Sequence, residues 1–404
     1  MLKTDTLVNY IFGILFLLFT CFTGVPFLKY IKVFLVLILI VIAIIKREKI
    51  NIEIILILII FVSHGILNTL YGFIKDNPGA LRTTTVYILW PILFVLFLGL
   101  FKKKDIVKID KLFVTVFKII IFICALQVFE GITGKTNIVS TIFHDKANHY
   151  INLDKRYILI SNPAINVIIF LLPYFISQAL LNRKRKYVLI SVIGLIIPFI
   201  TGRRAMILII LASIFVFLFI LIFLVRKIRK DLFFRVYKKI KFLFITGFVV
   251  SLIIVVNYST QFVNIFIKNK TGSNTERSKQ FVSLLEGFAG SPIFGEGAGA
   301  VASFSRSEAL PWAYELFYIS MLFHKGLLGF LLFFFALLWL MFNLIKIFKN
   351  NQNQHGYHAL SVLVALICFL IASATNPYIG KLDFMWVIFY PIALINAFKI
   401  VKTK

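Results

Sequence analysis

The sequence predicts an all-α, polytopic membrane protein, and three observations lead to this fold class. Hydrophobic residues make up 60% of the 404 residues, and the mean hydropathy is +0.97, whereas soluble domains are roughly 45–50% apolar. Apolar runs recur along the whole chain, each near the roughly 17–25 residues that a helix needs to cross a bilayer. Basic residues cluster in alternate loops between these runs. A single integral membrane domain over residues 1–404 is therefore expected.

The apolar runs predict about 12 transmembrane helices. They are expected near residues 7–23, 28–45, 50–67, 85–101, 112–130, 157–181, 187–200, 205–225, 242–260, 326–348, 359–375 and 384–398. Two connecting loops are long, one at residues 131–156 and a larger one at residues 261–313, between the ninth and tenth spans. These two loops have room for a functional site.

The distribution of charge predicts which side of the membrane each loop occupies. The two termini and the even-numbered loops hold 26 of the 44 Lys and Arg residues, and the other side holds 17. Because basic loops are retained in the cytoplasm, both termini are expected there and both long loops outside. The net charge of +28 then reflects topology, and a nucleic-acid partner is not expected.

The seventh predicted span is too short to cross a bilayer by itself. Residues 187–200 would rise about 21 Å as a helix, and Pro198 and Gly202 are expected to end it. Arg203 and Arg204 would then lie below the outer surface, where an arginine is costly unless it lines water or meets an anion. We expect both to bind an anion; the alternative is a turn whose arginines reach the interface.

Three further arginines are predicted on the outer side. Arg82 precedes the fourth span, whereas Arg277 and Arg306 lie in the loop 261–313. Arg277 belongs to a segment, residues 276–285, that is expected to form an amphipathic helix. Each arginine is a candidate anion ligand. The alternatives are contact with lipid headgroups for Arg82 and an ordinary solvated charge for the other two.

Two glycine-containing segments resemble nucleotide-binding loops but do not meet their requirements. Residues 295–299 (GEGAG) follow no predicted strand and lie in no βαβ unit. Residues 131–136 (GITGKT) have two residues too few between their glycines and lie on the predicted outer side. No cofactor is expected, and the glycines of 295–299 are expected to permit a tight bend or close backbone approach.

Metal-binding residue types occur in the first long loop, at His144, Asp145 and His149. No helical spacing of four and no second motif accompany them, so we expect solvated loop residues and no metal site. The three cysteines of the chain lie within apolar runs and are expected to be buried small side chains without disulfides.

A carboxylate among aromatic residues follows the second long loop. Residues 314–324 are apolar and too short to span, which predicts a re-entrant or interfacial helix, or an outward extension of the tenth span. Glu315 is flanked by Trp312, Tyr314 and Tyr318. A carboxylate in such surroundings can act as a base, and aromatic rings can stack on sugars. The alternative is a helix N-terminal acid stabilised by the helix dipole.

Several short segments of the second half of the chain carry a family resemblance. They are TGRRAMILIILAS from Thr201, ERSKQ from Glu276, SPIFGEGAGA from Ser291, YELFY from Tyr314, HKGLLGF from His324 and TNPYIGKLDFMW from Thr375. With the pattern of spans, they resemble the O-antigen polymerase and ligase superfamily. These are polytopic membrane glycosyltransferases that include the Wzy-type polysaccharide polymerases.

The resemblance implies a polymerase of surface polysaccharide, as in lipopolysaccharide biosynthesis, in the bacterial inner membrane. Its implied substrate is an oligosaccharide linked to a polyprenyl diphosphate such as undecaprenyl diphosphate. Repeat units would pass to a sugar hydroxyl at the outer leaflet without a metal or other cofactor. Membrane lipid and a chain-length regulator protein are the other partners that the resemblance implies.

The resemblance also implies roles for individual residues. Arg82, Arg203, Arg204 and Arg277 are expected to bind the diphosphate, because fixed guanidinium groups bind phosphate bidentately and stabilise departing negative charge. The expected catalytic residues are Arg203, Arg277 and Glu315, with Glu315 removing the proton of the acceptor hydroxyl. The acceptor sugar is expected to contact Trp312, Arg306, Tyr314 and Tyr318.

Two alternatives stay open at the level of sequence. The first is a ligase that transfers the same glycan to another acceptor lipid. Ligases of the superfamily typically carry a histidine–asparagine pair where this chain has Tyr314 and Glu315, and this departure disfavours a ligase. The second is a flippase for lipid-linked oligosaccharides, which can also have about twelve spans. Transporters often contain internal repeats, and the two halves of this sequence show no convincing similarity.

Overall fold

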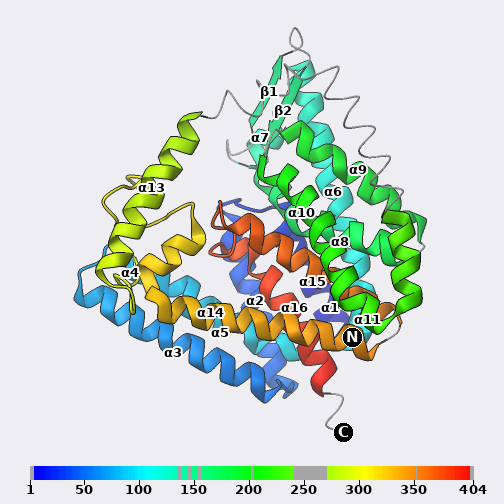
Figure 1. The fold of residues 1–404 in the computed structure, drawn as a ribbon, viewed down its shortest axis with the longest axis horizontal. Coiled ribbons are helices and arrows are strands. Elements are labelled where there is room, and N and C mark those ends of the chain that lie inside the picture. The colour runs from blue at the N-terminus through cyan, green and yellow to red at the C-terminus, as the bar shows by residue number, and fades with distance from the viewer. Residues whose placement is uncertain are drawn as a thin grey trace. The chain divides into compact units, whose positions relative to one another are not determined.

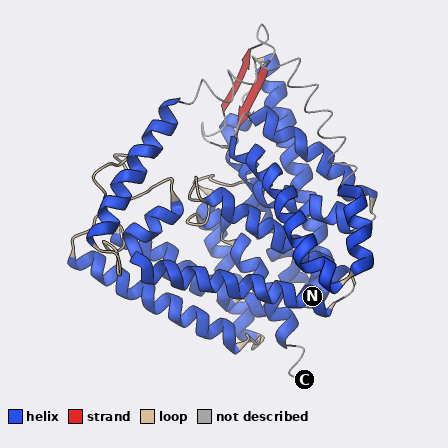
Figure 2. Cartoon of the chain, viewed as in Figure 1, coloured by secondary structure: helices blue, strands red, loops and turns tan. Residues whose placement is uncertain are grey.

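The computed structural model describes residues 4–134, 138–143, 148–152, 157–182, 184–201, 204–240, 271–351 and 353–400. These residues are mostly helical, with one two-stranded sheet (Figures 1 and 2). They form two compact units. The first comprises Met1–Leu112, Asn274–Leu344 and Ser373–Lys404, and the second comprises Phe113–Ser273 and Ile345–Ala372.

The first unit holds the N-terminal helices, most of the second long loop and the last helix. Its elements are α1 (Thr4–Cys21), α2 (Leu28–Ile45), α3 (Ile52–Ile74), α4 (Ala80–Thr84), η1 (Thr85–Leu89), α5 (Trp90–Leu96), η2 (Leu98–Leu100), η3 (Lys103–Asp105), most of α13 (Thr271–Gly290), most of α14 (Phe317–Asn350), η7 (Leu382–Phe384) and α16 (Trp386–Lys399). Helix α16 packs on α1 through Phe16 and Trp386, whose ring centroids are 5.0 Å apart. It packs on α5 through Phe94 and Phe389, at 4.9 Å.

The second unit holds the middle of the chain. Its elements are most of α6 (Ile106–Thr133), α7 (Ile138–Ile142), β1 (Asn148–Asn152), β2 (Tyr157–Ser161), η4 (Pro163–Val167), α8 (Ile168–Leu181), α9 (Arg185–Thr201), α10 (Arg204–Ile220), η5 (Leu221–Val225), α11 (Arg226–Ile228) and most of α15 (Gln354–Ser373). Residues 230–240 are also helical. Its core contains Phe113 and Tyr174, whose ring centroids are 5.0 Å apart, and Tyr174 also contacts His358.

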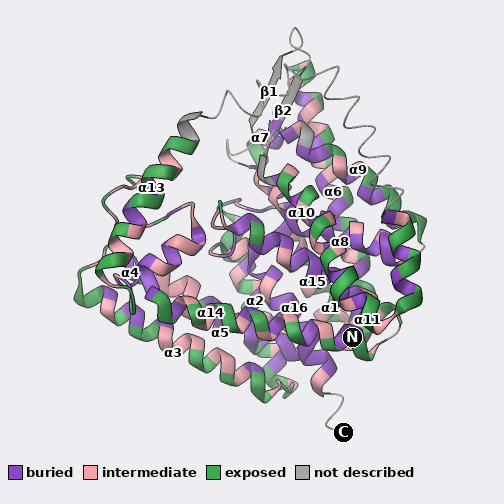
Figure 3. Cartoon of the chain, viewed as in Figure 1, coloured by how far each residue is buried: buried purple, intermediate pink, exposed green. Residues whose placement is uncertain are grey.

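Large apolar side chains remain exposed along several helices (Figure 3). On α3, exposed residues recur at Ile52, Leu56, Ile59, Leu67 and Leu70. An apolar face of this length would be unfavourable in water, and it is what a helix presents to lipid. The exposed faces therefore agree with a membrane location.

Nine helical segments of the described residues are long and apolar enough to cross a membrane. They are Leu28–Ile45, Ile52–Ile74, Ala80–Leu100, Lys103–Thr133, Pro163–Leu181, Met206–Ile228, Phe317–Asn350, Gln354–Ser373 and Leu382–Lys399. The prediction of an all-α, multi-pass membrane protein is thereby confirmed. Of the other three predicted spans, 7–23 corresponds to the apolar helix α1 and 187–200 to α9, whereas 242–260 lies outside the described residues. The number twelve stays a prediction.

The predicted span 157–181 begins later than expected. Residues 157–161 form strand β2, which pairs antiparallel with β1, so that Asn148 lies opposite Ser161. The helical segment starts at Pro163, and the side chain of Asn162 accepts a hydrogen bond from the N–H of Ile165 at 3.1 Å. A residue before proline prefers extended backbone, and Asn is a favourable N-cap. This local chemistry separates the strand from the span.

Helix α9 is longer than the sequence suggested. It runs for 17 residues to Thr201, with Pro198 inside it, so the expectation that Pro198 ends the span is wrong. A proline costs one backbone hydrogen bond. Here the hydroxyl of Thr201 donates to the carbonyl oxygen of Pro198 at 3.0 Å, which engages one of the terminal carbonyl groups of the helix.

Helix α14 contains a break that separates a short N-terminal part from the long apolar part. Gly326 has φ 61° and ψ −170°, which no helix contains. This region of backbone space is accessible essentially to glycine alone. Residues 317–325 are helical, and the non-helical backbone of Gly326 separates them from the long apolar part; the three alternatives for residues 314–324 stay predictions.

Candidate functional site

The described part of the second long loop begins with helix α13. The amphipathic helix predicted for residues 276–285 is present. Its buried positions are Gln280, Ser283 and Leu284, and the neighbouring Phe281 and Val282 are exposed. Leu284 packs with Tyr314 and Phe323 in a small hydrophobic cluster. One face of α13 is therefore held against the residues that begin α14.

Four charged side chains meet where α13 faces the end of the loop. We call Glu276, Arg277, Arg306 and Glu315 the ion-pair cluster. Nε of Arg277 lies 2.7 Å from Oε2 of Glu315, and Nη1 of Arg306 contacts Oε1 of the same carboxylate. Nε of Arg306 lies 2.8 Å from Oε2 of Glu276. Glu315 thus holds one arginine from the helix and one from the loop.

The backbone of Glu315 is also fixed. Its N–H donates a hydrogen bond to Oε1 of Gln280 at 2.9 Å, and Gln280 is 2% exposed. The side chains of Arg277 and Glu315 are 33% and 23% exposed. The backbone of the cluster is therefore held by a buried side chain, whereas its charged groups are partly exposed to solvent. Within the described residues, Nη1 and Nη2 of Arg277 have no hydrogen-bonding protein partner.

Tyr314 lies in the interior of this segment. It is 3% exposed, and its hydroxyl oxygen accepts a hydrogen bond from the N–H of Ala302 at 2.6 Å. Burial raises the pKa of the Tyr314 phenol, and the bond from Ala302 opposes this shift. Because the ring is enclosed by protein, it offers no face on which a sugar could stack. The position favours a structural role over the acceptor contact expected from the sequence.

Three other predicted site residues of the first unit are not members of the ion-pair cluster. Trp312 covers Gly79, where an added Cβ would lie 2.4 Å from the indole Cγ. Arg82 is exposed on α4, three residues after Gly79. Tyr318 is half-buried on α14, with its ring centroid 5.4 Å from that of Phe317.

Arg203 and Arg204 belong to the second unit. Arg203 lies outside the described residues, and Arg204 is the first residue of α10. Their predicted convergence with Arg277 on one diphosphate therefore stays a prediction. His144 and Asp145, also in this unit, lie outside the described residues, and His149 lies in β1.

The glycine-rich segment 295–299 fastens the loop to the helices. The N–H of Gly297 donates to the carbonyl oxygen of His324 at 3.1 Å, and that of Ala298 donates to Asn68 at 3.1 Å. Gly297 has φ 90°, and a Cβ there would lie 3.0 Å from Gly72. The expected bend and close backbone approach are both confirmed.

An ion pair fastens the same segment to the end of α3. Nζ of Lys75 lies 2.7 Å from Oε2 of Glu296. This hydrogen bond is the main cause of a raised pKa of Lys75. Together with the backbone bonds of Gly297 and Ala298, it fixes the position from which residues 300–316 return to α14.

Sequence reasoning missed three polar residues that organise the first unit. Gln280 orients Glu315, and Asn68 donates through Nδ2 to the carbonyl oxygen of His324 at 2.8 Å. The third residue, Lys325, is 2% exposed. Its place directly before Gly326 and a long apolar run is the one signal that could have identified it.

Asp383 has a structural role. Its carboxylate accepts hydrogen bonds from Nζ of Lys32 at 2.6 Å and from the N–H of Gly24 at 2.7 Å. Lys32 is 2% exposed. This pair ties α2 to the segment before α16.

Metal-ligand residues do not gather in the described part of the chain: it contains no group of three or more His, Cys, Asp or Glu side chains suited to a metal ion. All three cysteines are buried and free, as the sequence predicted. What the cluster offers chemically is fixed guanidinium groups, which suit an anionic ligand.

The fold defines a class of protein: an all-α, multi-pass membrane protein with an ordered polar loop. The comparisons with known proteins go no further, because no family model, curated protein or solved structure matches the chain.

Proposed function

We propose that the protein is a membrane glycosyltransferase that polymerises lipid-diphosphate-linked oligosaccharides at the outer leaflet. The single observation that supports this proposal best is the position of Arg277, which Glu315 holds on a loop outside the spans. Rigid guanidinium groups are suited to bind a diphosphate and to stabilise the charge that develops as it leaves.

In this reaction an acceptor sugar hydroxyl attacks the anomeric carbon of the donor glycan. The bond from that carbon to the diphosphate oxygen breaks, the polyprenyl diphosphate leaves with the electron pair, and the hydroxyl proton passes to a base. Arg277 offers its two terminal nitrogens to the diphosphate, and Arg203, Arg204 and Arg82 are the other proposed ligands.

Glu315 is better suited to positioning than to proton transfer. Each of its two carboxylate oxygens is paired with an arginine. A sugar hydroxyl would therefore have to compete with a guanidinium group for either oxygen. We therefore assign Glu315 the role of orienting Arg277 and Arg306. The alternative expected from the sequence is that Glu315 acts as the base, and separate measurement of kcat and KM distinguishes the two roles.

Trp312, Tyr318 and Arg306 remain the proposed acceptor contacts. Trp312 and Tyr318 are both partly exposed, unlike Tyr314, and partly exposed rings can stack on a sugar. The chain-length regulator protein and the location in a bacterial inner membrane also belong to this proposal.

Two rival functions remain, a ligase and a flippase. The two compact units do not correspond to consecutive halves of the chain, because the first unit combines its beginning, its later middle and its end. Repeat-built transporters divide along the chain into related repeats. The division seen here gives no support to a transporter of that kind.

Deletion of the gene and gel analysis of the surface glycan test the proposal. A polymerase predicts that a ladder of repeat lengths collapses to one repeat. Complete loss of surface attachment would indicate a ligase instead. Accumulation of lipid-linked units in the inner leaflet would indicate a flippase.

A further inference from the structure

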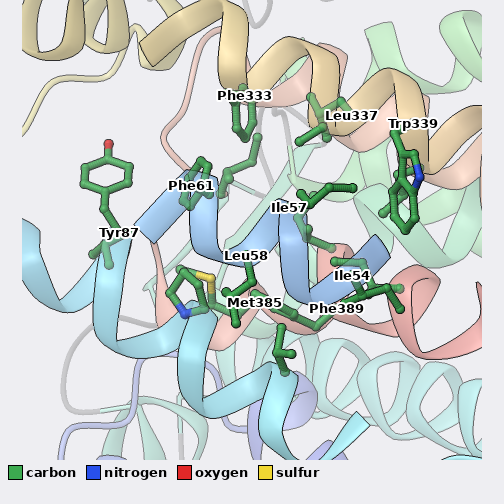
Figure 4. A pocket seen from close by; sticks show the side chains of 18 of the residues that line it. Ile54, Ile57, Leu58, Phe61, Tyr87, Phe333, Leu337, Trp339, Met385 and Phe389 are labelled. Carbon is green, nitrogen blue, oxygen red and sulfur yellow. The ribbon is translucent and has the colours of Figure 1, made fainter. Parts of the chain in front are cut away.

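Two cavities of the first unit differ in the charge of their walls. The cavity shown in Figure 4 lies between α3, η1, α14 and α16, and the described residues that line it include no charged side chain. The other lies between α1, α2, η2, α16 and the start of α6, and its lining includes Asp105 and Lys108. The second cavity therefore brings charge and apolar surface together, as a site for an amphiphile requires.

The lining of the second cavity changes from polar to apolar along its helices. On α1, the exposed Asn9 lies about one turn closer to the helix N-terminus than Gly13. On α6, the exposed Lys108 likewise precedes Leu112. The buried residues of the lining are all apolar: Leu39, Phe97, Leu98, Phe101, Ile109 and Ala393. The cavity thus has a polar end near the N-termini of α1 and α6 and an apolar interior.

The interior has room for part of a hydrocarbon chain. The volume of the cavity is about 170 Å³, and a cavity of roughly 150 Å³ can bind a benzene-sized molecule. Gly13 contributes to this space, because a Cβ added to it would have nothing within 4 Å.

The polar end carries an excess of positive charge. Nζ of Lys108 lies 3.0 Å from Oδ1 of Asp105, and the other oxygen of this carboxylate accepts a hydrogen bond from the N–H of Lys102 at 3.0 Å. Residues 102–108 and their ion-pair partners comprise five lysines and three carboxylates: Lys46, Lys102, Lys103, Lys104, Lys108, Asp5, Glu48 and Asp105. Two positive charges therefore exceed the negative ones.

Two of these lysines are placed to bind one anion. Lys104 and Lys108 are four residues apart in one helical segment, a spacing that puts them on the same side, and their side chains are 65% and 52% exposed. Lys104 shares the carboxylate of Asp5 with Lys46, at 3.4 and 2.5 Å. Exposed ion pairs contribute little free energy, so a phosphate group can compete for both lysines.

We propose that this cavity binds an anionic glycerophospholipid, with part of an acyl chain in the interior and the phosphate at Lys104 and Lys108. The polar end lies on the predicted cytoplasmic face, where anionic lipids are enriched and basic pockets between helices bind their head groups. Asp105 disfavours further negative charge, so a head group with a single charge, as in phosphatidylglycerol, is the best match. The inference is independent of the proposed function, because it uses none of the residues assigned to glycan transfer.

Photo-crosslinking of the purified full-length protein in detergent tests the inference. The probe is phosphatidylglycerol with a diazirine on one acyl chain, and mass spectrometry identifies the labelled peptides. We expect the label on peptides of α1 or α6. Unlabelled phosphatidylglycerol should displace the probe at a concentration about tenfold lower than phosphatidylcholine, since each lysine near an anionic lipid contributes several-fold in affinity.

Two variants each remove one feature of the site. Gly13→Leu fills the cavity while raising helix propensity, and it should reduce labelling about tenfold. The double variant Lys104→Gln/Lys108→Gln should weaken displacement by phosphatidylglycerol about tenfold and leave displacement by phosphatidylcholine unchanged. The double variant keeps the test valid if Gly13→Leu does not fold.

Matched controls carry similar changes at residues that do not line the cavity. Ile14→Phe adds bulk to a neighbour that is 51% exposed, and Lys227→Gln removes an exposed lysine of α11 on the same predicted face. Both should label as the wild type does. Phosphatidylglycerol should also raise the Tm of the wild type and of both controls, because a ligand stabilises the state that binds it, and it should not raise the Tm of Gly13→Leu.

Three results would overturn the inference. Labelling that survives both Gly13→Leu and the double lysine variant would place the lipid elsewhere. Equal displacement by phosphatidylcholine and phosphatidylglycerol would show that the lysines do not select the head group. Displacement by a polyprenyl phosphate at a lower concentration than by phosphatidylglycerol would identify a different class of lipid as the occupant.

Discussion

Nε of Arg277 lies 2.7 Å from Oε2 of Glu315, although 38 residues separate the two in the sequence. The contact joins α13 to the residue that precedes α14, and Arg306 reaches the other oxygen of the same carboxylate. One acidic side chain therefore sets the position of two basic ones. This arrangement leads to the first two predictions.

Replacement of Arg277 by Ala should reduce glycan transfer by about 10²–10³-fold, the effect typical of losing one donor that stabilises developing charge. Arg277→Lys should recover only part of the rate, because lysine lacks the planar fork of donors. The measurement is transfer by purified protein with lipid-linked repeat units. Lys279→Ala is the control, because Lys279 is an exposed cation on the same helix. Equal rates for Arg277→Ala and Lys279→Ala would place the diphosphate elsewhere.

Replacement of Glu315 by Gln should raise the KM for the donor by on the order of tenfold, because a charge-assisted contact to the arginines is lost. A catalytic base would instead lower kcat by about 10²–10⁴-fold with an unchanged donor KM. Separate measurement of kcat and KM decides between the two roles. An unaltered KM together with a kcat loss of that size would show that positioning is the wrong role.

The pair of Lys32 and Asp383 should be important for stability. Lys32→Met or Asp383→Asn leaves one buried polar or charged group without its partner, at a cost of about 3–5 kcal/mol for a broken buried pair. The double variant should recover part of the loss, since removing both partners is less unfavourable. Thermal unfolding in detergent measures each step. Lys29→Met serves as the control, because Lys29 is exposed on the same helix, and an equal loss in this variant would argue against the pair.

Gly326→Ala should destabilise the N-terminal part of α14 by about 1–3 kcal/mol, because the backbone conformation of Gly326 is nearly restricted to glycine. The added Cβ would also lie 2.2 Å from the carbonyl oxygen of Ile293. The expected result is faster proteolysis of the loop and a lower Tm. Gly13→Ala, where nothing lies within 4 Å of the added Cβ, should be neutral or slightly stabilising. If both alanine variants behave alike, the break is not needed for the fold.

The predicted topology can be tested with introduced cysteines and a membrane-impermeant maleimide. Ser303→Cys, at an exposed position of the loop, should react from outside, and the exposed Lys227→Cys should not. The native cysteines are at most 5% exposed and should give little background. The opposite labelling pattern would invert the membrane orientation and remove the basis for an outer-leaflet reaction.

The sequence by itself determined the fold class, because the hydropathy and the length of each apolar run are properties of the sequence that no distant contact can change. It determined α2 over Leu28–Ile45 as predicted, the burial of the cysteines and the helix of residues 276–285. Boundaries set by single residues were less predictable. Pro163 lies at the boundary between a strand and a span, whereas Pro198 lies inside helix α9. Whether a proline ends a helix depends on which neighbouring groups form hydrogen bonds with the backbone around it.

Only the tertiary structure decided the candidate site. The aromatic neighbours of Glu315 in the sequence suggested a base, but its actual partners are arginines brought there by the folding of the loop. Tyr314, beside it in the chain, turned inward to the core. Lys325 is buried against the rings of Tyr87 and Phe61, more than 200 residues earlier in the sequence. Local sequence patterns determine the secondary structure of a segment, whereas the surroundings of a charged side chain depend on the distant segments that pack around it.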